Sequence, residues 1–557
     1  MLGKLFIAAA FAAIVATPAS AQVTAQSILV PGVTYERQVE FTPHGPVVLD
    51  VVTAPRPDGS LYTLASALSN NTIVGTETLT QMERDVSATA TAVGVNGDYF
   101  VANPGKPAGI LMRSGVLDSA PASERSSLGI AADGTLTVAR VGFDGTWRGN
   151  GQRRQLDLNA APVKGHTTLY TQAWGTTTPA ESGVAVVVIG ALPPLVPNRV
   201  ASGAVTQVLS QGPVPIPPGG AVLVSRGGQA AHLTAEAPPG TTVEIRPTLT
   251  PNWSGMAGAI GGGPLLVDGG KAIFRARESF GDPVLTRRSA RAAVGQLEDG
   301  RIVLVTVEGG SSAYSSGMTN YELAGALARL DARTAMGLGT GPATAMAFDG
   351  TLLTRPTGGA EQAISDALLL SYNGVYAAPP SSATLSPNGD GVDDSLSLSY
   401  KLVRPSQVTA AVVGPGRVTI PLVQDAEQAG AHTLAWDGAG APEGSWRFVV
   451  TGLDDKSRTT TAERDFELNE TLGALQVSRS GQGVNATFAL AHPAAVTVTV
   501  EKANGIVLAT PVSRRLDAGT QTVSWKGTVA PGYRVRVVAA NTIGQATLVA
   551  PVVLQRP

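Results

Sequence analysis

The chain has no cysteine among its 557 residues. Disulfide bonds, cysteine-ligated zinc and thiol nucleophiles are therefore excluded. Only five histidines are present, and none forms an H-x-x-x-H pair, so the two-histidine zinc motif is absent too. Acid–base chemistry would then fall mainly to Asp and Glu side chains.

Long apolar runs and basic clusters are also scarce. The exception is the N-terminus, where Lys4, an apolar core over residues 5–15 and Ala19-Ser20-Ala21 are typical of a secretory signal peptide over residues 1–21. No later segment has the roughly 18 uninterrupted apolar residues of a transmembrane helix. The sequence predicts a secreted or extracellular protein, with the cell envelope as a further location, and export without disulfides is typical of bacteria. The formal net charge is −2 without a basic run, so nucleic acid is not an expected partner.

Glycine and proline are abundant instead, with 65 and 38 residues, which favours many turns between short strands. We predict an α+β fold with mixed β-sheets and few helices for the first mature domain. Helical spacing is found over residues 75–86 and again after Thr319, which stands at capping-box distance from Glu322.

The central element of that domain is a predicted β-hairpin over residues 291–308. Two apolar runs flank Asp299-Gly300, a pair favoured in two-residue type I′ turns. With that loop, the register places Arg291 opposite Glu308 at the open end. A strand-end ion pair and a ligand-facing pair both remain open.

Two further stretches carry candidate chemistry. Asn96 and Asp98 follow a buried strand, where folds often place a site, although Asn96-Gly97 also makes an ordinary turn. Gly262 and Gly263 belong to a Gly-Gly-Gly-Pro run that can present backbone N–H groups to an anion or can form a bulge.

These segments, taken in order, resemble the phosphodiester glycosidase family, whose animal member is the lysosomal uncovering enzyme. The resemblance covers roughly residues 28–378. The matching motifs are N-G-D-Y-F at 96–100, G-G-G-P-L-L-V at 261–267, A-R-A-A-V-G at 290–295, V-E-G at 307–309, G-M-T-N-Y-E-L-A at 317–324 and D-G-T-L-L-T-R-P at 349–356.

The family signature, approximately L-D-G-G-G-S-x-T-M, is altered at residues 338–346. Its Asp and Ser are replaced by Gly339 and Ala343, and Ala292 stands where Thr is usual. The resemblance implies hydrolysis of a sugar 1-phosphodiester, similar to an N-acetylglucosamine 1-phosphodiester, in envelope or extracellular glycopolymers. The altered signature leaves two alternatives, a catalytically impaired glycan-binding protein and a structural envelope protein.

Glycoside hydrolysis normally needs two carboxylates, and a departing phosphate needs fixed donors for its charge. In this interpretation Arg291 and the N–H groups near Gly262 and Gly263 hold the phosphate, and Asn96 positions sugar hydroxyls. The candidate catalytic carboxylates are Asp98 and Glu308. The candidate substrate-binding residues are Asn96, Gly262, Gly263, Arg291, Thr319 and Glu322, the last two also explained by the capping box.

The C-terminal part repeats itself after a linker at residues 379–384. The pattern around Tyr400 and Leu402 returns at Phe488 and Leu490, which predicts two tandem immunoglobulin-like β-sandwiches over residues 385–468 and 469–557. The first resembles a module of flagellar hook-capping proteins. Its oxygen-rich turn is a possible calcium site or a plain Asx turn. The candidate ligands are Asn388, Asp390, Asp393 and Asp394. No other cofactor is required by the sequence.

Overall fold

The computed structural model describes residues 22–87, 90–273, 278–389, 391–480 and 483–552. The predicted signal peptide and Asp390 lie outside the described residues. The described residues contain 43 β-strands and four α-helices. The prediction of an α+β fold is therefore wrong, and the fold is β-rich. Helical periodicity is confined to short segments, whereas turn residues elsewhere cut the chain into strands.

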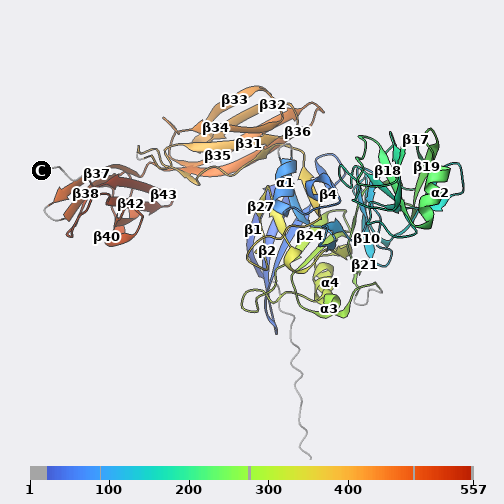
Figure 1. The fold of residues 1–557 in the computed structure, drawn as a ribbon. Helices are drawn as coiled ribbons and strands as arrows, with labels where there is room; N and C mark the ends of the chain where they lie inside the picture. Colours follow the sequence, from blue (N-terminus) through green and yellow to red (C-terminus); the bar gives the residue numbers. More distant parts are fainter. Residues whose placement is uncertain (1–21, 88–89, 274–277, 390, 481–482, 553–557) are drawn as a thin grey trace, which may run out of the picture. The chain divides into compact units, whose positions relative to one another are not determined.

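The chain divides into two compact units (Figure 1). The first comprises Met1–Asp85 and Ala92–Ser371, and the second comprises Val86–Thr91 and Tyr372–Pro557. The finer predicted division into a domain, a linker and two modules stays a prediction. In the part of the chain that the structure describes, no helix has the length and apolar character to span a membrane.

The first unit is organised around one eight-stranded sheet. Its order is β1 (Gln22–Val30), β2 (Val33–Thr42), β3 (Gly45–Ala54), β24 (Ile302–Val307), β23 (Arg291–Leu297), β25 (Ala332–Gly337), β21 (Leu265–Asp268) and β22 (Lys271–Ala272). Helix α4 (Asn320–Arg329) buries Leu323 and Leu327 against one face, where they meet Val303, Val305 and Val307. α3 (Asp282–Thr286) precedes this sheet's hairpin.

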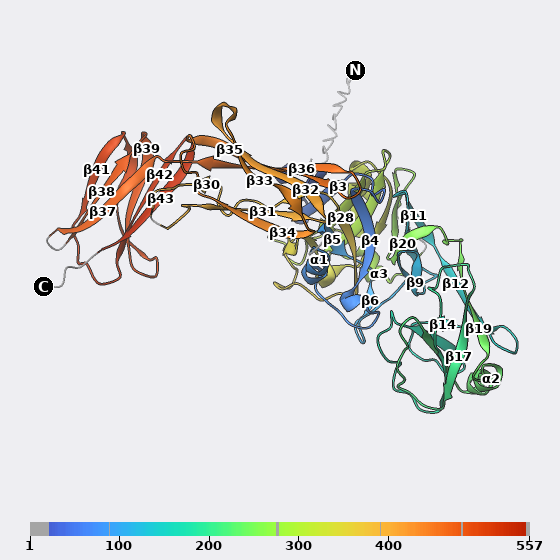
Figure 2. The same cartoon turned by 90° about the horizontal axis from the view of Figure 1, so that it is seen from above.

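Four further sheets complete the first unit, and several of their strands are labelled in Figure 2. One has the order β27 (Thr351–Leu352), β26 (Met346–Phe348), β5 (Thr91–Asn96), β28 (Asp366–Tyr372) and β4 (Tyr62–Leu68). Another has the order β11 (Leu136–Arg140), β10 (Ser126–Ala131), β20 (Met256–Gly261), β8 (Leu111–Arg113) and β9 (Val116–Ser119). β6 (Phe100–Val101) and β7 (Lys106–Pro107) form a two-stranded ribbon.

The last of these sheets belongs to a β-rich insertion with its own apolar core. Its order is β13 (Arg154–Gln155), β12 (Gly142–Arg148), β19 (Thr242–Thr250), β17 (Ala201–Leu209), β16 (Val184–Ile189), β18 (Ala221–Arg226), β15 (Thr167–Thr171) and β14 (Asp157–Leu158). Trp147, Leu223 and Ile245 are buried in this core. α2 (Gly228–Glu236) also lies in the insertion.

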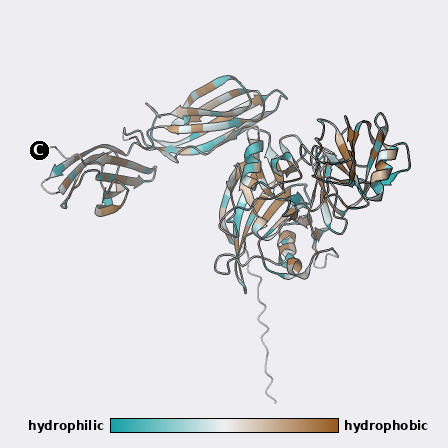
Figure 3. Ribbon diagram, viewed as in Figure 1, coloured by the Kyte–Doolittle hydropathy of each residue, from teal (hydrophilic) through white to brown (hydrophobic). Residues whose placement is uncertain are grey.

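The second unit contains two pairs of sheets, each with a separate core. The first pair is β29 (Tyr376–Ala377), β31 (Leu396–Leu402), β34 (Gly430–Trp436), and β30 (Thr384–Leu385), β36 (Thr459–Leu468), β35 (Gly444–Asp454), β32 (Ser406–Val413), β33 (Thr419–Glu427). The second pair is β37 (Leu472–Ser480), β38 (Gly483–Leu490), β41 (Gly519–Trp525), and β40 (Val507–Leu516), β39 (Ala494–Glu501), β42 (Arg534–Asn541), β43 (Gly544–Pro551). Hydrophobic and hydrophilic residues alternate along these strands (Figure 3), as expected when one face is buried. Assignment to the immunoglobulin-like class stays a prediction.

The predicted hairpin exists, but its register differs by one residue. Arg291 pairs with Val307, not with Glu308. Only Gly300 of the Asp-Gly pair has a positive φ, of 87°, whereas a type I′ turn needs two such residues. The Asp299 carboxylate instead accepts a hydrogen bond from the Arg301 N–H, and the Leu297 N–H donates to the Arg301 carbonyl. Because side chains alternate along a strand, the shift removes the predicted Arg291–Glu308 pair.

α1 (Leu79–Ser87) carries a fully buried carboxyl group, that of Glu83. One Glu83 oxygen accepts a hydrogen bond from the Gly350 N–H at 2.9 Å, and the other has no partner. Burial raises the pKa of Glu83 from 4.5 to about 8. The folded state therefore keeps a proton that the unfolded state releases.

This retained proton makes stability depend on pH. The Glu83 contribution is complete below pH 4.5 and is lost as the pH rises toward 8. We expect Glu83→Gln to reduce the loss of unfolding free energy over this interval, by up to about 1.4 kcal/mol per pH unit. Urea unfolding of both proteins between pH 5 and 8 measures the difference. Identical slopes would contradict a protonated Glu83.

Candidate functional site

Asn96 ends β5 and fastens the loop that carries the altered signature. Its Nδ2 donates to the Gly339 carbonyl at 3.0 Å, and its Oδ1 accepts from the Ala345 N–H at 3.2 Å. The Gly339 N–H in turn donates to the Gly97 carbonyl. Asn96 is buried, and its amide is engaged on both sides. Asn96 therefore has a structural role, which is to hold this loop in position. Its contact with sugar hydroxyls remains a prediction.

Asp98, two residues further on, lies in a buried cluster of charges. Its carboxylate oxygens lie 3.3 and 3.5 Å from two nitrogens of the Arg125 guanidinium, and one of them also accepts from the Tyr99 N–H. The Asp98 N–H donates to a carboxylate oxygen of Asp366 at 2.6 Å. Burial raises the pKa of both carboxyl groups, and their mutual repulsion raises that of Asp366 further. Lys106 also faces Asp98 electrostatically.

The Arg125 guanidinium lies over two aromatic rings. It is 5.3 Å from the centre of the Tyr99 ring and 5.6 Å from that of Phe280, within cation–π range. The Tyr99 hydroxyl is buried without a hydrogen-bond partner, and burial raises its pKa to about 12. Tyr99 is therefore a neutral donor next to a fixed cation.

Arg291 is buried at the start of β23, close enough to Tyr99 for the two side chains to interact electrostatically. Its Nε donates to the Met318 carbonyl at 3.0 Å and one terminal nitrogen donates to the Arg287 carbonyl at 2.6 Å. The other terminal nitrogen, Nη1, has no partner. Burial lowers the pKa of Arg291, and an electrostatic interaction with Tyr99 opposes this. An unpaired guanidinium N–H and an unpaired phenol near one another form a donor set suited to an oxyanion.

The glycine run lies close to this cluster. One of the backbone N–H groups predicted to hold an anion, that of Gly263, is already used within the protein. A side chain at Gly261 would collide with the Asp98 carboxylate, which places the two side by side. The Gly263 N–H donates to the Gly337 carbonyl at 2.8 Å. A side chain at Gly263 would meet the Glu278 carboxylate, and one at Gly262 would meet the Gly337 carbonyl. Close packing explains these glycines.

Glu308 lies in a different environment from Arg291. One of its oxygens accepts from Arg37 at 2.8 Å and from the Arg355 N–H at 2.9 Å. The other oxygen is buried without a partner. Arg37 also pairs with the buried Asp50 at 2.9 Å, and Tyr314 interacts with Glu308 electrostatically. The residues next to Arg291 and Glu308 in the chain are in contact, since Gly309 lies against Ala290. The Ala290 carbonyl also accepts a hydrogen bond from the Gly341 N–H, in the loop of the altered signature.

Thr319 and Glu322 form the capping box of α4. The Thr319 hydroxyl accepts from the Glu322 N–H, and the Glu322 carboxylate accepts from the Thr319 N–H at 2.8 Å. Glu322 also pairs with Arg288. The structural role accounts for both residues, while Glu322 additionally lines a hollow of about 270 Å³ with Met318 and Tyr321.

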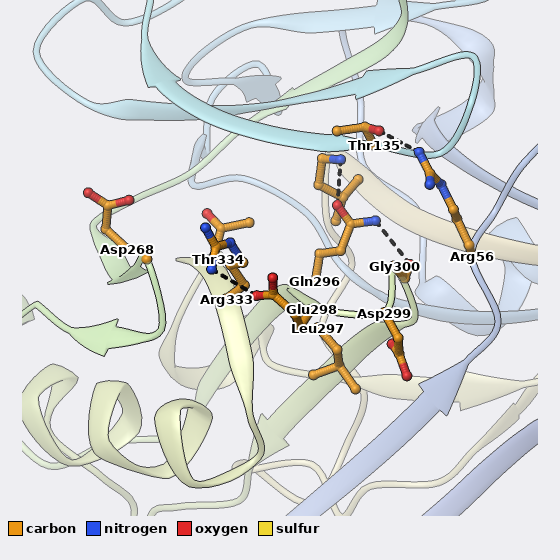
Figure 4. Close-up of a pocket in the computed structure, with 12 residues that line it drawn as sticks. Arg56, Thr135, Asp268, Gln296, Leu297, Glu298, Asp299, Gly300, Arg333 and Thr334 are labelled. Carbon is orange, nitrogen blue, oxygen red and sulfur yellow. Dashed lines mark hydrogen bonds and ion pairs between the residues drawn. The ribbon is translucent and has the colours of Figure 1, made fainter.

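A polar hollow beside the hairpin lies at its closed end, not at its mouth (Figure 4). It has a volume of about 440 Å³ and is bordered by Arg56, Asp268, Glu298 and Arg333. Arg333 is paired with Glu298, and the buried Gln296 side chain donates to the Gly300 carbonyl. Arg56 pairs with Asp133 as well, so most of the charged groups around this hollow already have partners within the protein.

The candidate calcium loop is partly described. The Asp394 carboxylate accepts from the N–H groups of Asn388, Gly389 and Gly391, which is the geometry of an Asx-type turn. Asp393 has a positive φ of 55°. Within the described ranges, no group of three or more His, Cys, Asp or Glu side chains is arranged to hold a metal ion. Because Asp390 lies outside those ranges, calcium binding stays a prediction.

Several residues of these clusters were not predicted from the sequence. They are Arg37, Asp50, Tyr99, Arg125 and Asp366. Tyr99 lies within the N-G-D-Y-F motif, so that motif was a usable signal for it. No local pattern distinguishes the other four residues, because only tertiary strand pairing brings them together.

Comparisons with known proteins bear on the first unit. The family model described as phosphodiester glycosidase matches residues 196–371, so the resemblance is confirmed for that segment. A hypothetical protein from Synechocystis shares 26% identity and a TM-score of 0.52, over 62% of this chain and 62% of its own. This chain thus spans less than two thirds of that protein. No curated protein matches the chain.

Two further solved structures are more distant. A candidate exported protein of Burkholderia pseudomallei shares 21% identity and a TM-score of 0.48, over 58% of this chain and 74% of its own. The catalytic domain of zebrafish N-acetylglucosamine-1-phosphodiester alpha-N-acetylglucosaminidase, auto-inhibited by its pro-peptide, shares 13% identity and a TM-score of 0.33, over 63% of this chain and 87% of its own. The resemblance of the C-terminal modules to hook-capping proteins has no counterpart in these matches and stays a prediction.

Proposed function

We propose that this protein is a secreted glycosidase that hydrolyses a sugar 1-phosphodiester, similar to an N-acetylglucosamine 1-phosphodiester, in envelope or extracellular glycopolymers. The observation that carries the proposal is the unpaired, buried donor set of Arg291 and Tyr99 beside the loop of the altered signature. Unpaired buried polar groups are costly, and a bound phosphate oxygen would satisfy both. The phosphodiester glycosidase match over residues 196–371 supports the same chemistry.

In this mechanism the charges of the first cluster hold the phosphodiester. Arg291 and Arg125 face the departing phosphate, which is a weak base and needs charge stabilisation more than protonation. Glu308 acts as base or nucleophile, because one of its oxygens has no partner. Asp98 is the second candidate, although its carboxylate is already held by Arg125 and Tyr99. Its role is then to fix the position of Arg125.

A second candidate function is glycan binding without turnover. The observation that favours it is the tight packing at Gly339, where a side-chain carbon would lie 2.9 Å from the Asp98 carbonyl oxygen. The loop is therefore built without the carboxylate that the family signature places there. A purely structural envelope protein is the third alternative, and it predicts neither binding nor turnover.

To test the proposal, the purified protein is incubated with methyl N-acetylglucosamine 1-phosphate and the release of free N-acetylglucosamine is measured. Binding of the same compound is measured in parallel by calorimetry. Turnover supports the proposed hydrolase. Saturable binding without release of sugar selects the glycan-binding alternative. If neither turnover nor binding is detected, both of these functions are overturned and the structural alternative remains. Repeating the assay with added calcium and with chelator tests the metal prediction for the second unit.

Arg291→Lys should weaken substrate binding with a smaller effect on kcat. Lysine keeps the positive charge but loses the fixed guanidinium Nη1, which is the Arg291 nitrogen left without a partner for a phosphate oxygen. We expect KM to rise about tenfold, which is the effect of losing about 1.4 kcal/mol of binding. Arg288→Lys is a matched control, since Arg288 is engaged with Glu322. Thermal unfolding identifies losses of stability, and an unchanged KM would remove Arg291 from the phosphate site.

A further inference from the structure

A row of polar residues crosses the central sheet on β2, β3 and β24. Arg37 pairs with Asp50 across β2 and β3, and Asp50 pairs with Thr306 across β3 and β24. Directly opposed residues lie on one face of a sheet, so these three side chains are neighbours. Glu308 follows Thr306 by two positions, and its N–H still donates to the Val48 carbonyl of β3. The Glu308 side chain therefore lies on the same face.

Arg37 holds both carboxylates of this row. Its Nε donates to Asp50 Oδ1 at 2.9 Å, and one terminal nitrogen donates to Glu308 Oε1 at 2.8 Å. The Asp50 side chain is 0% exposed and that of Glu308 is 2% exposed. Among the residues that the structure describes, no other basic side chain forms an ion pair with either carboxylate. With both carboxyl groups ionised, the row has one negative charge in excess.

Three oxygens of the row are buried and have no hydrogen-bond partner in the described part of the chain. They are Asp50 Oδ2, Thr306 Oγ1 and Glu308 Oε2. The donors that reach the two carboxylates are Arg37, the Tyr35 hydroxyl and the Arg355 N–H, and each binds the other oxygen of its carboxylate. The Thr306 side chain is fully buried. Because buried oxygens without a partner are costly, three of them in one row point to a bound group.

The number of oxygens and the excess charge indicate what kind of group fits. A proton on one carboxyl group would cancel the charge but would add no partner for Thr306. A water molecule would bond to the oxygens but would leave the charge uncancelled. A cation does both, because hard cations take carboxylate, hydroxyl and water oxygens as ligands, and buried charges in proteins are paired or coordinate metals.

We propose that Asp50, Thr306 and Glu308 together bind one hard cation, and that a monovalent ion such as sodium matches the excess charge. The site contains only two carboxylates, so it differs from the clusters of three or more His, Cys, Asp or Glu side chains that are absent from the described ranges. It is also separate in sequence from the candidate calcium loop around Asp394. The inference does not depend on the proposed function.

The proposed site does have a consequence for that function. The Glu308 oxygen that would bind the cation is the same oxygen that would serve as base or nucleophile. A cation on this oxygen withholds its lone pair from the sugar, so the cation is expected to inhibit turnover. Stability that depends on the cation in a chain without turnover would overturn the proposed function and leave the cation site intact.

Replacing choline chloride by sodium chloride at constant ionic strength tests the site without requiring activity. A ligand that binds only the folded protein stabilises it, so urea unfolding of the full chain should move to higher urea as sodium rises. Once sodium exceeds its Kd, each tenfold increase should raise the folding equilibrium constant about tenfold. Asp50→Asn should abolish this gain. Thr306→Val keeps the shape of the side chain without its hydroxyl, and it should weaken sodium binding. It is also the second variant if Asp50→Asn does not fold.

Asp118→Asn is the matched control. Asp118 is another buried carboxylate paired with an arginine, Arg113 at 2.6 Å, and lies outside this row, so the variant should keep the sodium-dependent gain. Potassium, calcium and magnesium chloride are tested in the same way, with calcium in an Asp394→Asn background to remove the candidate loop. Stabilisation by any of these ions that is lost in Asp50→Asn and reduced in Thr306→Val supports the site. No stabilisation by any ion, or equal stabilisation of the wild type and both variants, would overturn it.

Discussion

Glu308→Gln is expected to reduce kcat for a sugar 1-phosphodiester by a factor of about 10² to 10⁴, the usual contribution of a catalytic acid or base. Glutamine keeps the shape of the side chain, and its carbonyl oxygen can still accept from Arg37 and from the Arg355 N–H. Only the charge and basicity of the unpartnered oxygen are lost. Because binding groups elsewhere are untouched, KM should change little. Steady-state kinetics on the two proteins separate the two parameters.

Asp98→Asn is the comparison that gives this result its meaning. Both Asp98 oxygens interact with the Arg125 guanidinium, and Arg125 stacks on Tyr99 and Phe280. Loss of the Asp98 charge should therefore loosen Arg125 and raise KM more than it lowers kcat. Unchanged rates in both variants would remove both carboxylates from the mechanism. A large fall in kcat for Asp98→Asn alone would make Asp98 the reactive group.

Local sequence signals predicted local structure well in this protein. The capping box at Thr319 and Glu322 is present in the structure, because each of its bonds lies within one helical turn. The hairpin over residues 291–308 is present as well. The predicted register was wrong because the Asp299 side chain stabilises a different turn. An Asp-Gly pair alone does not show which of two possible turns will form.

The candidate site was predicted only in part, for a different physical reason. Compact sequence motifs contain Asn96, Asp98 and Gly262. In the structure, the side chain of Asn96 donates to the Gly339 carbonyl and so joins the first motif to the loop of the altered signature. Arg37 and Asp50 meet Glu308 only because β24 inserts beside β3 in the central sheet. Such long-range pairing leaves no periodic trace in the chain. The buried charges of both clusters were therefore accessible only from the fold.

Restoring the signature carboxylate by Gly339→Asp is expected to destabilise the protein without increasing turnover. A side-chain carbon at this position would lie 2.9 Å from the Asp98 carbonyl oxygen and 3.0 Å from Asn96 Nδ2. The first of these is backbone and cannot rotate away, so the loop or β5 must shift. Overpacking of this kind costs about 1–3 kcal/mol. Urea unfolding measures the cost, and the phosphodiester assay measures turnover in the same preparation.

Ala343→Ser is the matched control on the same loop. It restores the second signature residue by adding one hydroxyl to a small side chain that is 9% exposed, and a change of this size should cost less than about 1.5 kcal/mol. If Gly339→Asp instead folds with wild-type stability and raises kcat, the loop can open, and the signature carboxylate completes the site. The glycan-binding alternative would then describe a protein that lost its activity by that single change. If the variant is unstable and inactive while Ala343→Ser is neutral, the packing of Asn96 and Asp98 against Gly339 has replaced the signature, and any turnover must come from Glu308 and its neighbours.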